Sequence, residues 1–121
     1  MTTELPPNDE AATESSAEAV DRLAGELEEV RRREVGKAIE YDRAGIVFAA
    51  REAGRLSFRL RADIAEHALR TPETSKSARG REWVTLGSEA MDTFTVDRAA
   101  AWFESAWRLA GDLPESGGAP N

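Results

Sequence analysis

Arginine side chains are the residues of this chain with the clearest capacity for binding chemistry. Residues 55–61 (RLSFRLR) alternate polar and apolar side chains, and side chains on a strand point to opposite faces in turn. One face of this predicted strand is therefore apolar and the other strongly basic. Guanidinium groups on a solvated face can bind phosphate or carboxylate groups. The candidate binding surface consists of Arg51, Arg55, Arg59, Arg61, Arg79 and Arg81.

Two interpretations of this basic surface compete. Contacts to phosphates would make it a nucleic-acid site. Alternatively, Glu34, Glu40 and Glu52 neutralise the arginines across strands, each pair contributing about 0.2–1 kcal/mol. Outward aromatic residues would favour single-strand binding, but Phe58 is on the apolar face. We therefore favour a salt-bridged, solvated sheet face and keep nucleic-acid binding as an alternative.

The other reactive residue types predict neither catalysis nor a metal site. The chain has no cysteine and one histidine, His67, which excludes thiol catalysis, disulfides and cysteine-based metal sites. Ser57, Ser88 and Ser105 lack the glycines of a nucleophile elbow. Single glycines at predicted turns form no phosphate-binding loop. We therefore expect a protein that is not an enzyme and that uses no cofactor and no metal.

The elements that position the arginines begin with a helix. Ser15 and Glu18 form a capping box. Apolar residues then follow at helical spacing and predict about four turns, with the arginines at 31–33 near the end. The apolar positions are Val20, Leu23, Leu27 and Val30.

Three strands with tight connections should follow, near residues 35–41, 45–51 and 55–61. The segment 42–45 and the segment 52–54 have turn composition, and Gly54 is free to adopt a positive φ. Three neighbouring strands with such short loops predict an antiparallel meander.

The second half of the chain should contain a short helix (62–70), a polar loop (71–80), a strand (81–86) and a last helix from its N-cap Thr95 to residue 110. Phe103 and Trp107 fall in the middle of the apolar stripe of that helix and should be core residues. Trp102 lies at its edge and serves the core or an interface. Trp83 shares a strand face with Thr85, and that face is expected to be partly open.

The predicted order is α-β-β-β-α-β-α. It indicates an α+β fold, a two-layer sandwich in which an antiparallel sheet carries helices on one face. We expect a single domain over residues 15–110, a disordered acidic tail at 1–14 and a flexible tail at 111–121.

Residues 46–109 resemble the MmcQ/YjbR family of small bacterial proteins. The resemblance is carried by VFAA followed by GRLSFRL, by AEHAL, by REWVTL and by WFESAWRLA. Weaker similarity extends to the TfoX N-terminal type and to luciferase-associated domains. The resemblance implies an exposed antiparallel sheet, described as a double-wing arrangement, and no catalytic residues. The family's role is undefined; DNA binding has been suggested for it.

The net charge of −7 is unevenly distributed along the 121 residues. Residues 1–19 hold five acids and no base, whereas residues 51–81 hold eight bases and four acids. Acidic ends of this kind disfavour nucleic acid as the partner. Arginine outnumbers lysine 14 to 2, as expected of a GC-rich bacterial genome. No apolar run could span a membrane, and no secretory signal is visible, so we expect a cytoplasmic protein.

These observations predict a non-catalytic domain that binds a protein partner or a second copy of itself. Nucleic-acid binding through the basic sheet face is one alternative. The other is a small-ligand-binding protein or enzyme, with a pocket between Trp83, the 71–80 loop and the last helix.

Overall fold

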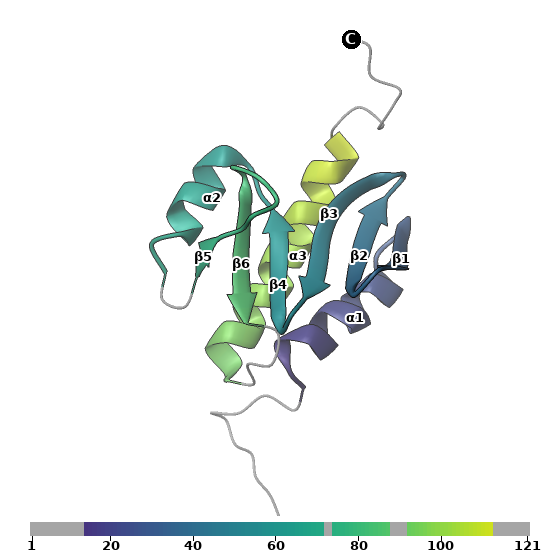
Figure 1. The fold of residues 1–121 in the computed structure, drawn as a ribbon, viewed down its shortest axis with the longest axis horizontal. Helices are drawn as coiled ribbons and strands as arrows, with labels where there is room; N and C mark the ends of the chain where they lie inside the picture. The colour runs from purple at the N-terminus through teal and green to yellow at the C-terminus, as the bar shows by residue number, and fades with distance from the viewer. Residues whose placement is uncertain (1–13, 72–73, 88–91, 113–121) are drawn as a thin grey trace, which may run out of the picture.

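The computed structural model describes residues 14–71, 74–87 and 92–112, which form helices packed on an antiparallel sheet (Figure 1). The strand order is β1-β2-β3-β4-β6-β5. This confirms the predicted α+β class. The elements are α1 (Ser16–Glu26), β1 (Val30–Val35), β2 (Ala38–Arg43), β3 (Ile46–Glu52), β4 (Arg55–Arg59), α2 (Ala62–Ala68), β5 (Ser75–Lys76), β6 (Trp83–Gly87) and α3 (Thr93–Asp112).

The core lies between the sheet and the helices α1 and α3, which cover the same face (Figure 1). Phe103 of α3 is at its centre, with ring centroids 5.4 Å from Tyr41 and 5.1 Å from Phe48. In β4, the alternation predicted for residues 55–61 is confirmed, because Leu56 and Phe58 are fully buried. Burial of such side chains stabilises the fold by about 1.5–3 kcal/mol each.

The predicted meander is confirmed as β2, β3 and β4, but its first strand begins at Ala38 and not near residue 35, because residues 36–37 form the turn after β1. Two-residue turns join these strands, and both residues of each turn have positive φ: 54° at Ala44, 91° at Gly45, 53° at Ala53 and 75° at Gly54. Such turns match the right-handed twist of the strands that they join.

The structure corrects the predicted first helix. Apolar spacing predicted a helix through residues 30–33, but α1 ends at Glu26. Glu29 adopts a positive φ of 66°, which does not continue a right-handed helix. The segment Val30–Val35 is instead β1, which pairs with β2 along its whole length. Here long-range strand pairing outweighs the local helical period.

A β-bulge in β3 changes which side chains of that strand face the helices. Tyr41 and Asp42 are adjacent in β2, but the residues opposite them, Ala49 and Val47, are two apart. Phe48 lies between them without an opposite residue, and both Phe48 and Ala49 are buried. The alternation therefore shifts by one residue beyond the bulge.

Two boundaries in the second half also differ from the prediction. The loop expected at 71–80 contains β5, which pairs with β6; residues 72–73 lie outside the described part. Helix α3 begins at Thr93, ahead of the predicted N-cap Thr95. Asp92 is the capping residue, because its Oδ2 accepts the backbone N–H and the hydroxyl of Thr95 at 2.9 and 2.8 Å.

The predicted tails at 1–14 and 111–121 fall almost entirely outside the described residues. Glu14 is described, and its Oε1 lies 2.9 Å from Nη2 of Arg22. At the other end, α3 continues through Gly111 to Asp112.

Candidate functional site

The sheet face opposite α1 and α3, here called the open face, carries half of the predicted arginine surface. Cross-strand register aligns Glu40, Ala50, Ser57 and Thr85 in one row across β2, β3, β4 and β6. Residues directly opposite one another share a face. Ser57 and Thr85 are joined by a hydrogen bond of 3.2 Å between their hydroxyls. The middle of this row is thus a floor of small side chains.

Arg79 crosses this floor from the loop before β6. Its Nη1 lies 3.1 Å from Oε2 of Glu40 in β2, and its Nη2 lies 3.7 Å from Oε1 of Glu52 in β3. The guanidinium carbon is 5.5 Å from the ring centroid of Trp83 in β6. Only 26% of the Arg79 side chain is exposed. The arginine therefore ties the loop to two strands and covers the centre of the open face.

Backbone contacts position Arg79 for this role. The amide of Arg79 donates to the hydroxyl of Ser77 at 3.1 Å, and the amide of Ser77 donates to the carbonyl of Trp83 at 3.2 Å. Trp83 in turn donates its amide to the carbonyl of Gly80 at 3.2 Å. A Cβ at Gly80 would stand 3.1 Å from the Trp83 indole, so glycine allows the loop to lie against the ring.

Other carboxylates neutralise further arginines, including two of β1 that are not part of the predicted surface. Asp42, whose side chain is 2% exposed, lies 3.4 Å from Nε of Arg31 and 3.5 Å from Nε of Arg33. Arg59 lies 3.7 Å from Glu82. Within the described residues, Arg55 forms no ion pair. The expected neutralisation by Glu40 and Glu52 is thus present, whereas the third predicted acid, Glu34, pairs with no described base.

The six predicted surface arginines do not form one cluster. Arg55, Arg59 and Arg79 lie on the open face. Arg81 is exposed and lines a groove at the end of the sheet, and Arg61 precedes α2, 3.7 Å from Asp63.

The predicted position of Arg51 is wrong, because Arg51 lies on the helix side of the sheet and not on the open face. Its cross-strand partner is the buried Leu56. Its Nη1 is 4.0 Å from Oδ2 of Asp21 in α1. The bulge at Phe48 explains the error, since it shifts the alternation of β3 before Arg51 is reached.

Sequence reasoning also missed the cluster around Asp21. Oδ1 of Asp21 accepts the Tyr41 hydroxyl at 2.6 Å and Nε of Arg32 at 3.2 Å. Burial raises the pKa of Tyr41 well above its usual range, and the hydrogen bond to Asp21 adds to this rise. The cluster fastens α1 to β1 and β2, which is a structural role. Arg32 was predicted to lie in a helix. Only a correct prediction of β1 could have placed it beside Tyr41 and so revealed this cluster.

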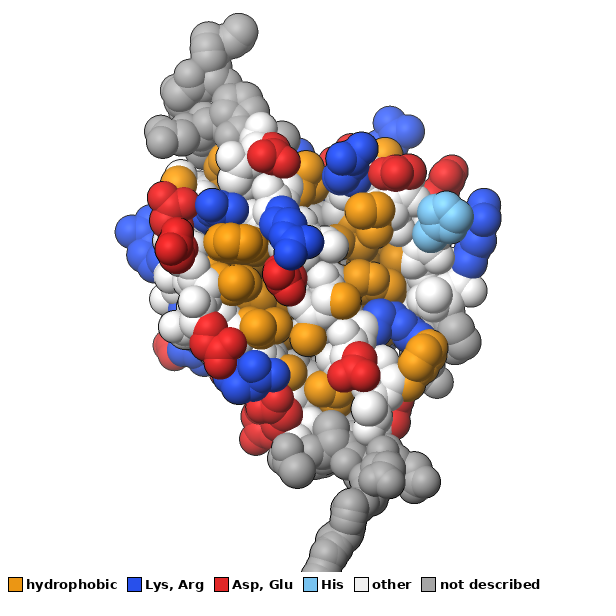
Figure 2. Space-filling view, turned by 180° about the vertical axis from the view of Figure 1, so that it is seen from behind, with side chains coloured by type: hydrophobic (Ala, Val, Ile, Leu, Met, Phe, Trp, Pro, Cys, Tyr) orange, Lys and Arg blue, Asp and Glu red, His pale blue; other side chains and the backbone are white. Residues whose placement is uncertain are grey.

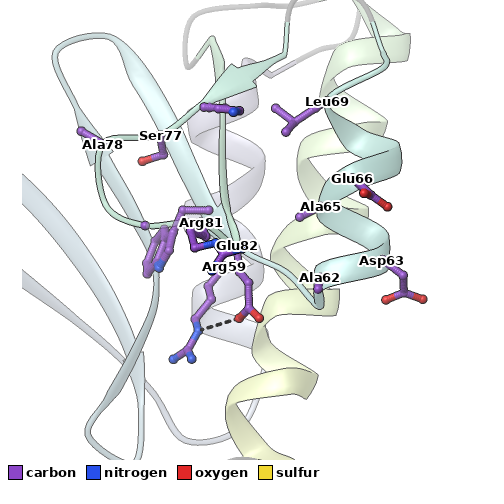
Figure 3. A pocket seen from close by; sticks show the side chains of 13 residues that line it. Arg59, Ala62, Asp63, Ala65, Glu66, Leu69, Ser77, Ala78, Arg81 and Glu82 are labelled. Carbon is purple, nitrogen blue, oxygen red and sulfur yellow. Dashed lines mark ion pairs between the residues drawn. The ribbon is translucent and has the colours of Figure 1, made fainter.

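A groove opens between α2 and residues 76–83, and we call it the α2 groove (Figure 3). Its volume is about 1180 Å³. This location agrees with the predicted pocket at Trp83 and the 71–80 loop, but its helical wall is α2, not the last helix. Its apolar lining comprises Ala62, Ala65, Leu69, Ala78 and Trp83.

The charged side chains of the α2 groove differ in their engagement. Arg59 and Glu82 pair with each other at its edge (Figure 3). Lys76 and Arg81 line the groove and form no ion pair with any described residue. The acids Asp63 and Glu66 of α2 also line the groove, so an entering chain would find an apolar wall with two available cations and two acids.

Among the described residues, no group of three or more His, Cys, Asp or Glu side chains could hold a metal ion. His67 is exposed on α2. No helix in the described ranges is long and apolar enough to cross a membrane.

The helix side of the molecule shows strips of hydrophobic side chains between charged ones (Figure 2). Among the residues that the structure describes, the most exposed large hydrophobic ones are Phe94, at the start of α3, and Val35, at the end of β1.

In comparisons with known proteins, no family, no curated protein and no solved structure matches the chain.

Proposed function

We propose that this chain is a non-catalytic protein-interaction domain of the MmcQ/YjbR type, which receives a segment of its partner in the α2 groove. One observation carries the proposal: the groove combines an apolar wall with Lys76 and Arg81, which pair with no described acid. A mixture of apolar contact and a few charges is typical of protein-recognition surfaces.

The nucleic-acid alternative is weakened by the ion pairs of the open face. Phosphate binding needs several cations that are free to displace counterions. Arg79 is held by Glu40 and Glu52, and Arg59 faces Glu82. Binding a phosphate there would require these ion pairs to break. Trp83 is the aromatic residue nearest to this region, and Arg79 already lies over its ring.

The small-ligand alternative fits the groove less well than a peptide segment does. Small-molecule pockets usually enclose about 300–1,000 Å³ and bury most of the ligand. The α2 groove has a volume of about 1180 Å³ and opens along the length of α2 (Figure 3). A groove of this shape suits an extended or helical segment of another protein.

Site-specific photo-crosslinking tests the proposal. The photoreactive residue p-benzoylphenylalanine would replace Ala78 in the groove, and, as a matched control, exposed Asp97 on α3. In cells of the natural host, ultraviolet light should give a discrete protein adduct at Ala78 alone, and Arg81→Glu should remove it. An adduct that nuclease digests would support nucleic-acid binding instead. Equal labelling at both positions, or no protein adduct at Ala78, would contradict the proposal.

A further inference from the structure

We propose that β1 pairs with β1 of a second copy of this chain, antiparallel and about a two-fold axis, so that the two sheets become one. β1 is the rim of the sheet, and no described element lies beyond it (Figure 1). Its residues are exposed after Val30. Alternate backbone N–H and C=O groups on its outer side have no strand partner, which makes it a template for another strand.

The opposite edge of the sheet is much less suitable. It is β5, which has only two residues, Ser75 and Lys76. β1 has six residues, enough for a ladder of strand hydrogen bonds. β1 also lies at the far end of the sheet from the α2 groove, so this inference is independent of the proposed function.

The three arginines of β1 would normally keep two such edges apart. In this structure, acids behind the strand hold them. Arg31 and Arg33 share the buried carboxylate of Asp42, and Arg33 also lies 3.8 Å from Glu40. Arg32 lies 3.2 Å from Asp21. The repulsion between two β1 edges is therefore reduced by charges already in place.

Symmetry restricts how the two strands can align. A two-fold axis that joins two sheets edge to edge keeps the open faces on the same side, so opposite residues must share a face. The axis must then pass beside one residue of β1, which lies opposite its own copy; the alignment is said to be centred on that residue. Centring on Arg32 sets Arg31 opposite Arg33 twice and Arg32 opposite itself. Centring on Arg33 sets Arg32 opposite Glu34 twice, with one like-charged pair, Arg33 opposite itself.

The alignment centred on Arg33 is the complementary one. Glu34 forms no ion pair with the described residues, and it would gain Arg32 of the other copy. Val35, which is 46% exposed, would lie against the stem of Arg31. The one like-charged pair of this alignment is Arg33 opposite its own copy. Arg33 has two acids beside it, Asp42 and Glu40, whereas Arg31 and Arg32 have one each. Charge complementarity therefore favours a second copy as the occupant.

Single cysteines test both the contact and its alignment, because the chain contains no native cysteine. Paired residues of antiparallel strands have Cα atoms about 4.5–5.5 Å apart, within reach of a disulfide. Mild oxidation of Arg33→Cys should give a covalent dimer. Arg31→Cys and Val35→Cys should not, because their own copies lie about 13 Å apart along the strand, at about 3.3 Å per residue. Equal linkage at all three positions, or none at position 33, would overturn the proposal.

Charge exchange tests the same pairing without oxidation. By sedimentation equilibrium, Glu34→Arg should raise the dissociation constant of the dimer about tenfold, since each attractive cross-strand pair becomes repulsive. Adding Arg32→Glu to it should restore dimerisation, because the two signs are then exchanged in both copies. Glu66→Arg, an equal charge change on exposed α2, should have no effect. A full-length chain that stays monomeric, or a double variant that fails to regain association while its circular dichroism is native, counts against the dimer.

Hydrogen exchange separates a second copy from an occupant within the same chain. Protection of the β1 amides should increase with protein concentration. Protection that is already complete in dilute protein would show that a segment of the same chain covers the edge, and would overturn the proposal. Protection of the β1 amides that appears only when another protein is added would also overturn it.

Discussion

At the scale of single residues, buried and half-buried carboxylates decide which arginines are available. Asp42 forms ion pairs with two arginines of β1, and it accepts a hydrogen bond from the amide of Gly45 at 3.2 Å. Glu40 holds Arg79 in place over the sheet. The positive charge of the open face is therefore partly internal to the structure. Arg55 on the open face forms no ion pair with a described residue, and neither do Lys76 and Arg81 in the α2 groove.

Trp107 makes a specific polar contact in addition to its apolar packing. Its indole N–H donates to the carbonyl of Glu28 at 2.8 Å, and Arg43 stacks 4.1 Å from its ring centroid. Trp107→Phe removes the hydrogen bond and weakens the stacking, so the free energy of unfolding should fall by about 1–2 kcal/mol. Urea denaturation measures the change. Trp102→Phe, which loses similar ring area but no described hydrogen bond, should cost about 1 kcal/mol less; equal losses would contradict this role of the indole N–H.

At the scale of elements, β1 shows where local sequence reasoning fails. Val20, Leu23, Leu27 and Val30 follow helical spacing, yet the helix ends before Leu27. Residues 30–35 form a strand because they pair with β2. The spacing of apolar residues within one segment does not report on such pairing. In β4 the same reasoning succeeds, because Leu56 and Phe58 are buried while the polar residues that alternate with them lie on the open face. Strict alternation in a half-buried strand is a local signal, whereas an exposed edge strand has almost none.

The candidate site was predictable to a similar extent. Arg55 and Arg59 were placed correctly by the alternation of a single strand. The position of Arg51 depended on the bulge at Phe48 in its own strand, which the pairing with β2 determines and no local pattern reveals. The route of Arg79 across the sheet depended on the loop and on Glu40, Glu52 and Trp83 together. Sequence could therefore predict two of the neutralising acids, Glu40 and Glu52, but neither the other acids nor which arginine each of them holds.

Asp42 should be the main tie between β1 and the rest of the sheet. Asp42→Asn keeps an acceptor for the amide of Gly45 but loses both charged pairs, and should cost about 1 kcal/mol because Arg31 and Arg33 are well exposed. Asp42→Ala also leaves the amide of Gly45 without its acceptor and should lower the free energy of unfolding by about 2–3 kcal/mol. Hydrogen exchange should locate the loss in β1 and the turn at Gly45. Faster exchange throughout the sheet, or equal effects of the two variants, would disagree with this assignment.

The cap of α3 should make stability depend on acidity. The hydrogen bond from the Thr95 hydroxyl, and to a smaller extent that from the Thr95 amide, lowers the pKa of Asp92 in the folded protein. The resulting stabilisation is complete above the unfolded pKa, about 3.9, and is lost as the pH falls through the lower folded value. Asp92→Asn keeps a capping oxygen that does not titrate. Thermal midpoints from pH 6 to pH 2 should therefore show the wild type losing its advantage over Asp92→Asn on acidification; a constant difference would refute this.

At the scale of the whole molecule, charge is divided between ends and middle. The five acids of residues 1–19 contrast with the eight bases of residues 51–81, and the fold then neutralises much of this basic region internally. Acidic ends repel nucleic acid, and internal ion pairs remove cations that could bind it. Both features act in the same direction. They favour protein contacts in the α2 groove and along β1 over contacts with phosphates.

Removing the internal acids should convert the open face into a phosphate-binding surface. Glu40→Gln with Glu52→Gln releases Arg79 and leaves shape nearly unchanged. The variant should bind heparin and duplex DNA at low salt, and the logarithm of its binding constant should fall linearly with the logarithm of the salt concentration. The wild type should bind neither heparin nor DNA. Fluorescence anisotropy across a salt series measures both. Glu28→Gln with Glu66→Gln makes the same charge change away from the face and should bind no better than the wild type. If this control binds equally well, net charge and not the release of Arg79 governs binding; if the wild type binds as tightly, the arginines were never masked.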